Sequence, residues 1–153
     1  MKEHLSTDPK YFIEIFGVDG KLRDSFTVYN TVVSAGKAQL ALLAGDATAT
    51  PFTYLALGTS STAVSVGQTS LQAEIVDSGL ARAAATVSRT TTTVTNDTLT
   101  LVYTWTASGT KSIEEIGVFN ASSAGTMLSR ALTGTKSIIS GETIQATYTC
   151  AFA

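Results

Sequence analysis

Two segments in the second half of the chain alternate between apolar and small polar residues, and this alternation constrains the fold more than any other feature. In residues 98–107 the alternating apolar side chains are Leu99, Leu101, Tyr103 and Trp105. In residues 143–152 they are Ile144, Ala146, Tyr148, Cys150 and Phe152. Successive side chains of a strand point to opposite faces, so both segments predict antiparallel strands with one buried and one solvated face.

Shorter apolar runs bounded by turn residues predict the other strands. These runs are residues 11–16, 22–29, 52–57 and 81–95. Asp19-Gly20 favours a hairpin turn between the first two runs, because both residues tolerate positive φ. Asn96-Asp97 is predicted to form a two-residue turn before the strand that starts at Thr98.

One segment, residues 31–44, is predicted to be a helix. Asn30 or Thr31 can cap its start, and Gly45 stands where a C-terminal cap belongs. Gly36 weakens the prediction by about 1 kcal/mol relative to alanine. Apolar residues surround the second half of this helix, so we expect it to be buried against a sheet or a partner.

These elements predict one domain over residues 11–153, a mainly antiparallel β-sandwich or barrel with one short helix near residues 31–44. Residues 1–10 are polar and are expected to form a flexible N-terminal arm. Cys150 is the only cysteine, so no internal disulfide can form, and its place in an alternating strand predicts a buried thiol.

Composition excludes several classes of partner. Charged residues make up 14% of the chain and the net charge is −2, with no basic run, so no nucleic-acid partner is expected. No apolar run approaches the roughly 20 residues of a membrane helix, so no membrane partner is expected. The N-terminal segment lacks the apolar core of a signal peptide.

Candidate chemistry is sparse. His4 is the only histidine and lies in the polar arm. Ser34 and Lys37 match S-x-x-K, but the companion motifs of serine acyl enzymes are missing. The acidic residues are scattered without metal-ligand spacing. We therefore expect no catalytic residues, no metal and no cofactor, and we do not expect an enzyme.

Residues 113–130 predict a β-hairpin around a five-residue loop at residues 121–125. In that register Val118 lies opposite Leu128 and Ile116 lies opposite Arg130. One face would carry the candidate structural or interface residues, which are Glu114, Ile116, Val118, Leu128 and Arg130. Glu114 would then lie diagonal to Arg130, within reach of an ion pair.

Two alternatives remain open for this hairpin. A slip of one residue would place Glu115, and not Glu114, on the face of Arg130. The opposite face would carry Ile113, Phe119 and Met127, so both faces are partly apolar. Either the predicted helix or another subunit could cover this second face.

Several of these segments also carry a family resemblance. The residues concerned are FTYLALGT at 52–59, TSLQAEI at 69–75 leading to Arg82, EIGVFN at 115–120, GTMLSR at 125–130 and GETI at 141–144. In this order they resemble a group of small β-rich virion proteins of tailed bacteriophages, described as head decoration (cement) proteins or as tail and tail-fibre components. NTVVSAGKAQLALLAG at 30–45 is similar to the short helix that often precedes the first of these strands. The resemblance covers roughly residues 25–153.

The resemblance implies an all-β core and a homo-oligomer, often a trimer, attached to a larger particle. It implies no enzyme activity, cofactor or catalytic residue. The leading interpretation is a capsid decoration protein, assembled in the host cytoplasm, that binds the major capsid protein or another virion protein and stabilises the head shell. The alternatives are a tail or tail-fibre subunit, and a glycan-binding β-sandwich. A glycan site would need exposed aromatic residues, whereas Trp105 falls in the row that faces the core.

Overall fold

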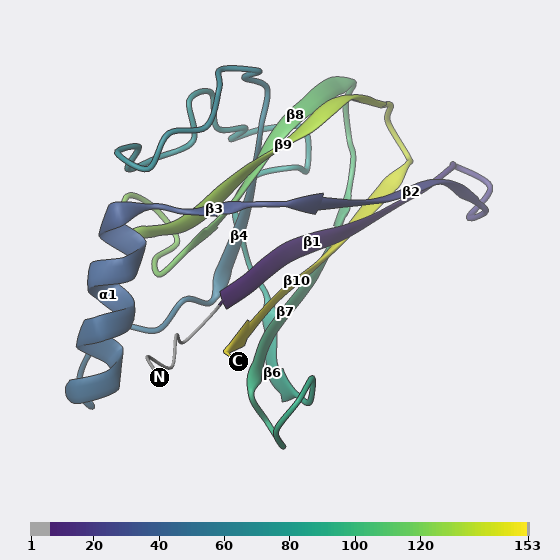
Figure 1. Cartoon of the computed structure of the whole chain (residues 1–153). Coiled ribbons are helices and arrows are strands. Elements are labelled where there is room, and N and C mark those ends of the chain that lie inside the picture. The colour runs from purple at the N-terminus through teal and green to yellow at the C-terminus, as the bar shows by residue number, and fades with distance from the viewer. Residues whose placement is uncertain (1–6, 153) are drawn as a thin grey trace.

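The computed structural model describes residues 7–152, which form two five-stranded antiparallel sheets and one helix (Figure 1). Sheet A has the order β2 (Leu22–Tyr29), β1 (Thr7–Phe16), β10 (Thr143–Phe152), β7 (Thr98–Thr106) and β6 (Thr86–Thr90). Sheet B has the order β3 (Thr31–Val32), β9 (Met127–Ile138), β8 (Lys111–Phe119), β4 (Tyr54–Gly58) and β5 (Ala83–Ala84). The arrangement confirms the predicted β-sandwich, and it is an open sandwich and not a closed barrel.

The alternating segments supply much of the core between the sheets. Ile144, Ala146, Tyr148 and Cys150 on β10 are all fully buried. Trp105 on β7 is 2% exposed, and its indole N–H donates to the carbonyl of Ala81 at 2.8 Å. This bond satisfies the only polar group of a buried indole. The predicted inward rows are therefore confirmed for these residues.

The backbone changes sheets at both edges of the sandwich. Asn30 separates β2 of sheet A from β3 of sheet B, and both are edge strands. At the other edge, Ala85 separates β5 of sheet B from β6 of sheet A. The single strand predicted over residues 81–95 is thus wrong, because this segment divides its pairing between two sheets.

The predicted tight turn at Asn96-Asp97 is also wrong. β6 ends at Thr90, so seven residues connect it to β7. The carboxylate of Asp97 accepts backbone N–H bonds from Thr92, Thr93 and Val94 at 2.6 to 2.8 Å. A short acidic side chain that satisfies three loop amides stabilises this longer connection.

The predicted flexible arm does not extend to residue 10. Residues 7–10 belong to β1, where Lys10 pairs with Thr149 of β10 and with Tyr29 of β2. Main-chain pairing with β10, and at Lys10 also with β2, holds this polar stretch in the sheet. Side-chain polarity alone does not indicate this pairing. The rest of the predicted arm, including His4, lies outside the described residues.

The helix α1 runs from Ser34 to Gly45, three residues later than predicted at its start. Thr31 and Val32 pair instead with Arg130 and Ser129 of β9, so neither Asn30 nor Thr31 caps the helix. Gly36 is the only buried residue of α1, and a Cβ at this position would overlap the carbonyl oxygen of Leu128. The glycine that lowers helix propensity therefore permits close packing on β9.

The expected burial of the second half of the helix is not found among the described residues. Leu42 is 47% exposed, and Ala41 and Ala44 are also exposed. Gly36 packs on β9, and Leu40 and Leu43 are only partly buried against the core, while the far end of the helix extends beyond the sheets (Figure 1). Apolar helix surface is thus left without a cover from residues 7–152.

Candidate functional site

The hairpin of β8 and β9 contains a fully buried ion pair, but its acidic partner is Glu115 and not Glu114. The Nε of Arg130 donates to Oε2 of Glu115 at 2.6 Å, and neither side chain is exposed. The predicted Glu114–Arg130 pairing is therefore wrong. Val118 pairs with Ser129 while Phe119 pairs with Met127, so Leu128 is an extra residue on β9. This β-bulge shifts the register by one residue, and Arg130 lies opposite Gly117, diagonal to Glu115.

The five candidate residues consequently do not share one face, and they do not form a surface. Ile116, Val118 and Leu128 are fully buried in the core between the sheets. Glu114 is half-buried and accepts a bond of 3.3 Å from the hydroxyl of Thr135. Four of the five, Ile116, Val118, Leu128 and Arg130, are buried inside the chain, so they pack its interior and offer no surface to a partner.

The carboxylate of Glu115 also holds the segment of residues 59–82, here named the covering segment. It accepts the backbone N–H groups of Gln72 and Ala73 at 3.1 and 2.7 Å. Nη1 of Arg130 donates to the side chain of Gln68 at 3.1 Å. Charge-assisted bonds of this kind are strong, so the ion pair fixes irregular backbone onto sheet B.

A second arginine fixes the far end of the covering segment. Arg82 forms a two-bond pair with Glu74 at 2.6 and 2.9 Å, and it donates to the carbonyls of Ala121 and Ala124. Its guanidinium carbon lies 3.6 Å from the centre of the Phe119 ring. The sequence marked Arg82 only through the family resemblance, because no periodic pattern indicates these contacts.

The covering segment buries the second apolar face of the hairpin within the chain. Phe119 and Met127 form a cluster with Ala56 of β4, with Leu71 of the covering segment and with Val33 next to α1. All five residues are at most 5% exposed. The cover is thus neither a second subunit nor the body of the helix. Ile113, expected on this face, lies in the core between the sheets.

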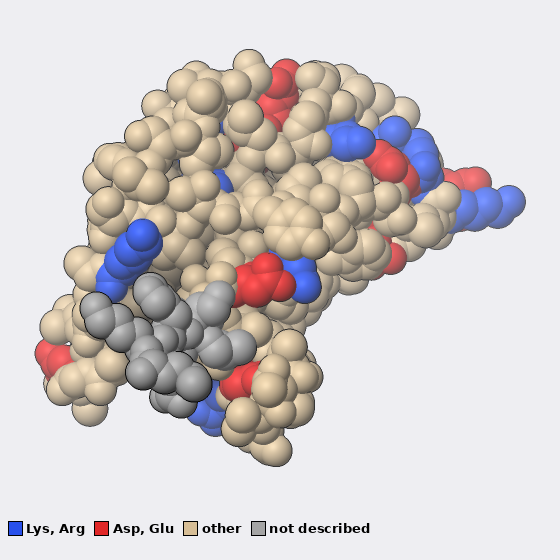
Figure 2. All heavy atoms as spheres, in the orientation of Figure 1, with Lys and Arg blue, Asp and Glu red and all other residues tan. Residues whose placement is uncertain are grey.

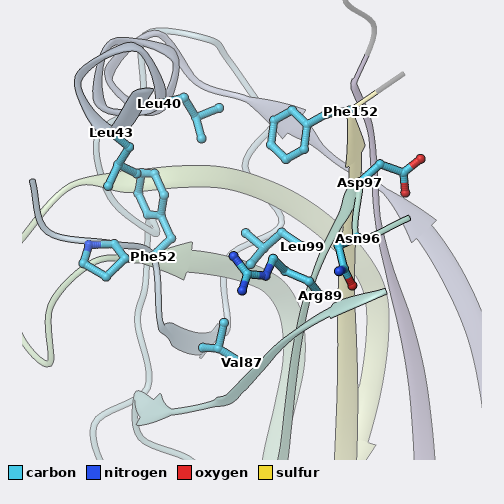
Figure 3. Close-up of a pocket in the computed structure, with 10 residues that line it drawn as sticks. Leu40, Leu43, Phe52, Val87, Arg89, Asn96, Asp97, Leu99 and Phe152 are labelled. Atoms are coloured by element: carbon cyan, nitrogen blue, oxygen red, sulfur yellow. The ribbon is translucent and has the colours of Figure 1, made fainter. Parts of the chain in front are cut away.

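An apolar groove lies between α1 and one end of the sandwich (Figure 3). Its volume is about 250 Å³, and an adjoining hollow of about 510 Å³ continues along the helix. Leu40 and Leu43 from α1 and Phe152 from β10 line both spaces. The side chains that line the groove itself are Leu40, Leu43, Pro51, Phe52, Val87, Arg89, Asn96, Asp97, Leu99 and Phe152.

The polar residues of the groove do not form a catalytic arrangement. The carboxylate of Asp97 is already bonded to the loop amides, and these bonds, led by that of Val94, hold its pKa well below the usual range. Arg89 belongs to the exposed edge strand β6. The groove therefore suits an apolar occupant better than a reacting substrate.

A buried polar cluster lies between the sheets, beside the second half of β10, where Tyr11 pairs with Tyr148. The hydroxyls of Tyr11 and Ser129 are 3.1 Å apart, and Asn30 donates to Ser129 at 2.7 Å. Burial raises the pKa of Tyr11 and of the Cys150 thiol. A thiol with a raised pKa is a poor nucleophile, so Cys150 is a packing residue, as its strand position predicts.

Residues 7–152 contain no group of three histidine, cysteine or acidic side chains placed to hold a metal ion. Over the same residues, no helix has the length and apolar character needed to cross a membrane. No family model, curated protein or solved structure matches the chain. Functional interpretation therefore depends on the chain's own residues and geometry.

Proposed function

We propose that the protein is a structural protein of tailed-bacteriophage virions that acts as a capsid decoration (cement) protein. It would bind the head shell as a homo-oligomer and bridge neighbouring copies of the major capsid protein or another virion protein. The observation that carries the proposal is the apolar groove beside α1, which residues 7–152 leave open.

Binding at this groove would favour assembly through burial of apolar surface. Leu40, Leu43 and Phe152 are partly exposed around it, and each square ångström of apolar surface removed from water contributes about 25 cal/mol. A partner that binds only the folded subunit also shifts the equilibrium towards the assembled state by mass action. This mechanism uses binding alone and requires no reaction.

Two further features support the proposal. The resemblance to phage virion proteins spans most of the described chain, and the all-β sandwich is the kind of core that it implies. Charged residues form 14% of the sequence, below the roughly 25% typical of globular domains, which favours contact with other proteins over wide exposure to water.

Gold labelling of tailed particles with an antibody against this protein tests the location. The expected result is label over the heads. Label confined to the tails would favour the tail or tail-fibre alternative, and particles without label would contradict a virion role.

A groove variant tests the surface. Leu43→Asp introduces a charge into the groove and is expected to abolish co-sedimentation of the purified protein with particles that lack it. Leu42→Asp is the matched control, because Leu42 lies on the same helix, is 47% exposed and does not line either hollow. Circular dichroism must show that both variants fold. Equal co-sedimentation of the two would exclude the groove as the contact.

The glycan-binding alternative has less support. Trp105 is 2% exposed and offers no ring to a sugar, so this function would have to use Tyr29 and Phe12, which are 71% and 41% exposed. Neither residue lines the groove or the adjoining hollow, and ligand sites for small molecules are usually concave.

A further inference from the structure

The outer face of sheet A is a separate surface with a regular pattern. Its side chains come from alternate positions of the strands, opposite to the buried rows. Most carry hydroxyls, and those that are partly or fully exposed include Ser25, Thr27, Thr86, Ser88, Thr104, Thr147 and Thr149. Thr100 also points to this side but is buried. Figure 2 shows that uncharged residues cover most of the visible surface over β1 and β2, with charged atoms towards the turn between these strands and near the start of β1.

The most exposed apolar side chain of β1, Phe12, marks the central row of this face. Phe12 pairs with Thr27 of β2 on one side and with Thr147 of β10 on the other. Thr147 pairs in turn with Val102, and Val102 pairs with Thr86 of β6. Paired residues of an antiparallel sheet point to the same face, so these side chains form one continuous row of methyl groups and the single ring of Phe12.

The two rows on either side of the central row differ in charge and in size. One row contains Lys10, with Tyr29 and Thr149 as its neighbours. The other contains Glu14, with Ser25 and Gln145 as its neighbours. A base and a large ring thus stand on one side of Phe12, and an acid and a small side chain stand on the other.

We propose that this face is a two-fold interface at which two copies of the chain pack sheet against sheet, with the axis along the row of Phe12. Such an axis exchanges the two outer rows. Lys10 then faces the partner's Glu14, Tyr29 faces the partner's Ser25, and Phe12 faces the partner's Phe12. The face is therefore complementary to itself in charge and in side-chain size, which is the requirement for an isologous contact.

The dimensions of packed sheets agree with this contact. Sheets pack about 10 Å apart, and residues two positions apart on a strand are separated by roughly 7 Å. Lysine and glutamate side chains can meet across such a gap. Hydroxyl groups both donate and accept hydrogen bonds, so a surface of threonines can bond to a copy of itself.

Lys10 is available for this pairing. Its present acidic neighbour is Asp8 at 3.4 Å, and the two side chains are 41% and 61% exposed. An exposed pair at this distance contributes little to stability. Exchange of Asp8 for the partner's Glu14 would therefore cost the subunit little.

The inference rests on the homo-oligomeric part of the proposed function, and it is independent of the location in the virion. A two-fold contact gives a dimer in its simplest form, in place of the trimer that the family resemblance implies. Analytical ultracentrifugation of the full chain is expected to give about twice the mass of the 15.9 kDa subunit.

Charge reversal tests the pairing of Lys10 with the partner's Glu14. Lys10→Glu and Glu14→Lys alone each place like charges opposite one another, so each variant should dimerise at least about tenfold more weakly than the wild type. An equimolar mixture of the two variants brings a negative face against a positive face. The mixture should recover the dimer, as a complex of one copy of each.

Lys37→Glu is the matched control, since Lys37 is an exposed lysine on α1, away from sheet A. It should sediment as the wild type does, and thermal melting should show that all the variants fold. A monomeric or trimeric wild type would overturn the inference, as would single variants that dimerise normally or a mixture that stays monomeric.

Discovery of a dimer without gold label on virions would contradict the virion role and leave the interface intact. Labelled virions together with a monomeric protein would contradict the two-fold interface and leave the virion role intact. The two experiments therefore separate a failure of the interface from a failure of the proposed function.

Discussion

The outer faces of the two sheets differ in how the chain treats them. On sheet B the outer side chains include Phe119, Met127 and the buried Glu115–Arg130 pair, and the covering segment lies over them. On sheet A they are mostly threonines around the 41%-exposed Phe12, and most of them are partly or fully exposed among residues 7–152. Residues 59–82 thus cover the apolar outer face of sheet B, whereas residues 7–152 leave most of the polar outer face of sheet A exposed. The exposed face is the one that we propose binds a second copy.

Among the predicted changes, loss of the buried acid Glu115 should reduce the free energy of unfolding most. Glu115→Ala leaves Arg130 buried without a counter-charge and removes the acceptor for two amides of the covering segment. The free energy of unfolding in urea should fall by about 3–5 kcal/mol. Glu14→Ala, on the outer face of sheet A, should change it by less than about 0.5 kcal/mol when the protein is dilute enough to be monomeric. Equal losses in the two variants would contradict the contrast.

Truncation of Leu71, a buried apolar residue of the covering segment, should cause the next largest loss of stability. Leu71 is 5% exposed within the cluster on sheet B, so Leu71→Ala should cost about 2–5 kcal/mol. Hydrogen exchange of the amides of residues 59–73 should also accelerate. Phe12→Ala is the matched change on sheet A and should cost the dilute protein less than about 1 kcal/mol. Unchanged exchange in Leu71→Ala would show that the polar contacts alone hold the segment.

Disruption of the contact between the helix and β9 should cause a smaller loss of stability. Gly36→Ala raises helix propensity by about 1 kcal/mol, but the new methyl group would overlap the carbonyl of Leu128. We expect a net loss of about 1–3 kcal/mol in urea unfolding. At Gly45 a Cβ meets nothing within 4 Å, so Gly45→Ala is the control and should not destabilise. A stabilised Gly36→Ala protein would show that the helix can move away from β9.

The smallest predicted effect is on the stability of the protein at low pH. Backbone hydrogen bonds lower the pKa of Asp97 in the folded protein, so its contribution to stability is present above the ordinary aspartate pKa of about 3.9 and is lost as the pH falls below that value. Asp97→Asn should therefore reduce the fall in melting temperature between pH 5 and pH 2. A variant with the same pH dependence as the wild type would contradict this role.

Local patterns predicted the parts of the fold that depend on local geometry. The period of two in β7 and β10 is a property of any strand with one buried face, so the rows of Trp105 and Tyr148 could be read from the sequence. The sequence could not show the extra residue at Leu128, because a bulge depends on how two strands pair. That single residue moved the ion pair from Glu114 to Glu115.

Elements that depend on distant partners were the least predictable. Thr31 and Val32 have neighbours that favour a helix, yet pairing with β9 makes them a strand. The covering segment has no periodicity, and its order depends on Glu115 and Arg82. Main-chain bonds similarly extend β1 into residues that looked like an arm. In each case tertiary contacts override local preference.

The backbone crossings at Asn30 and Ala85 have a mechanical consequence. Because each long edge of the sandwich is a continuous chain that leaves one sheet and joins the other, a force that pulls the sheets apart acts on covalent bonds at both edges. The two sheets could separate only after the edge strands had lost their main-chain hydrogen bonds. A single cut in the backbone at either crossing should remove this covalent resistance at that edge and leave it at the other.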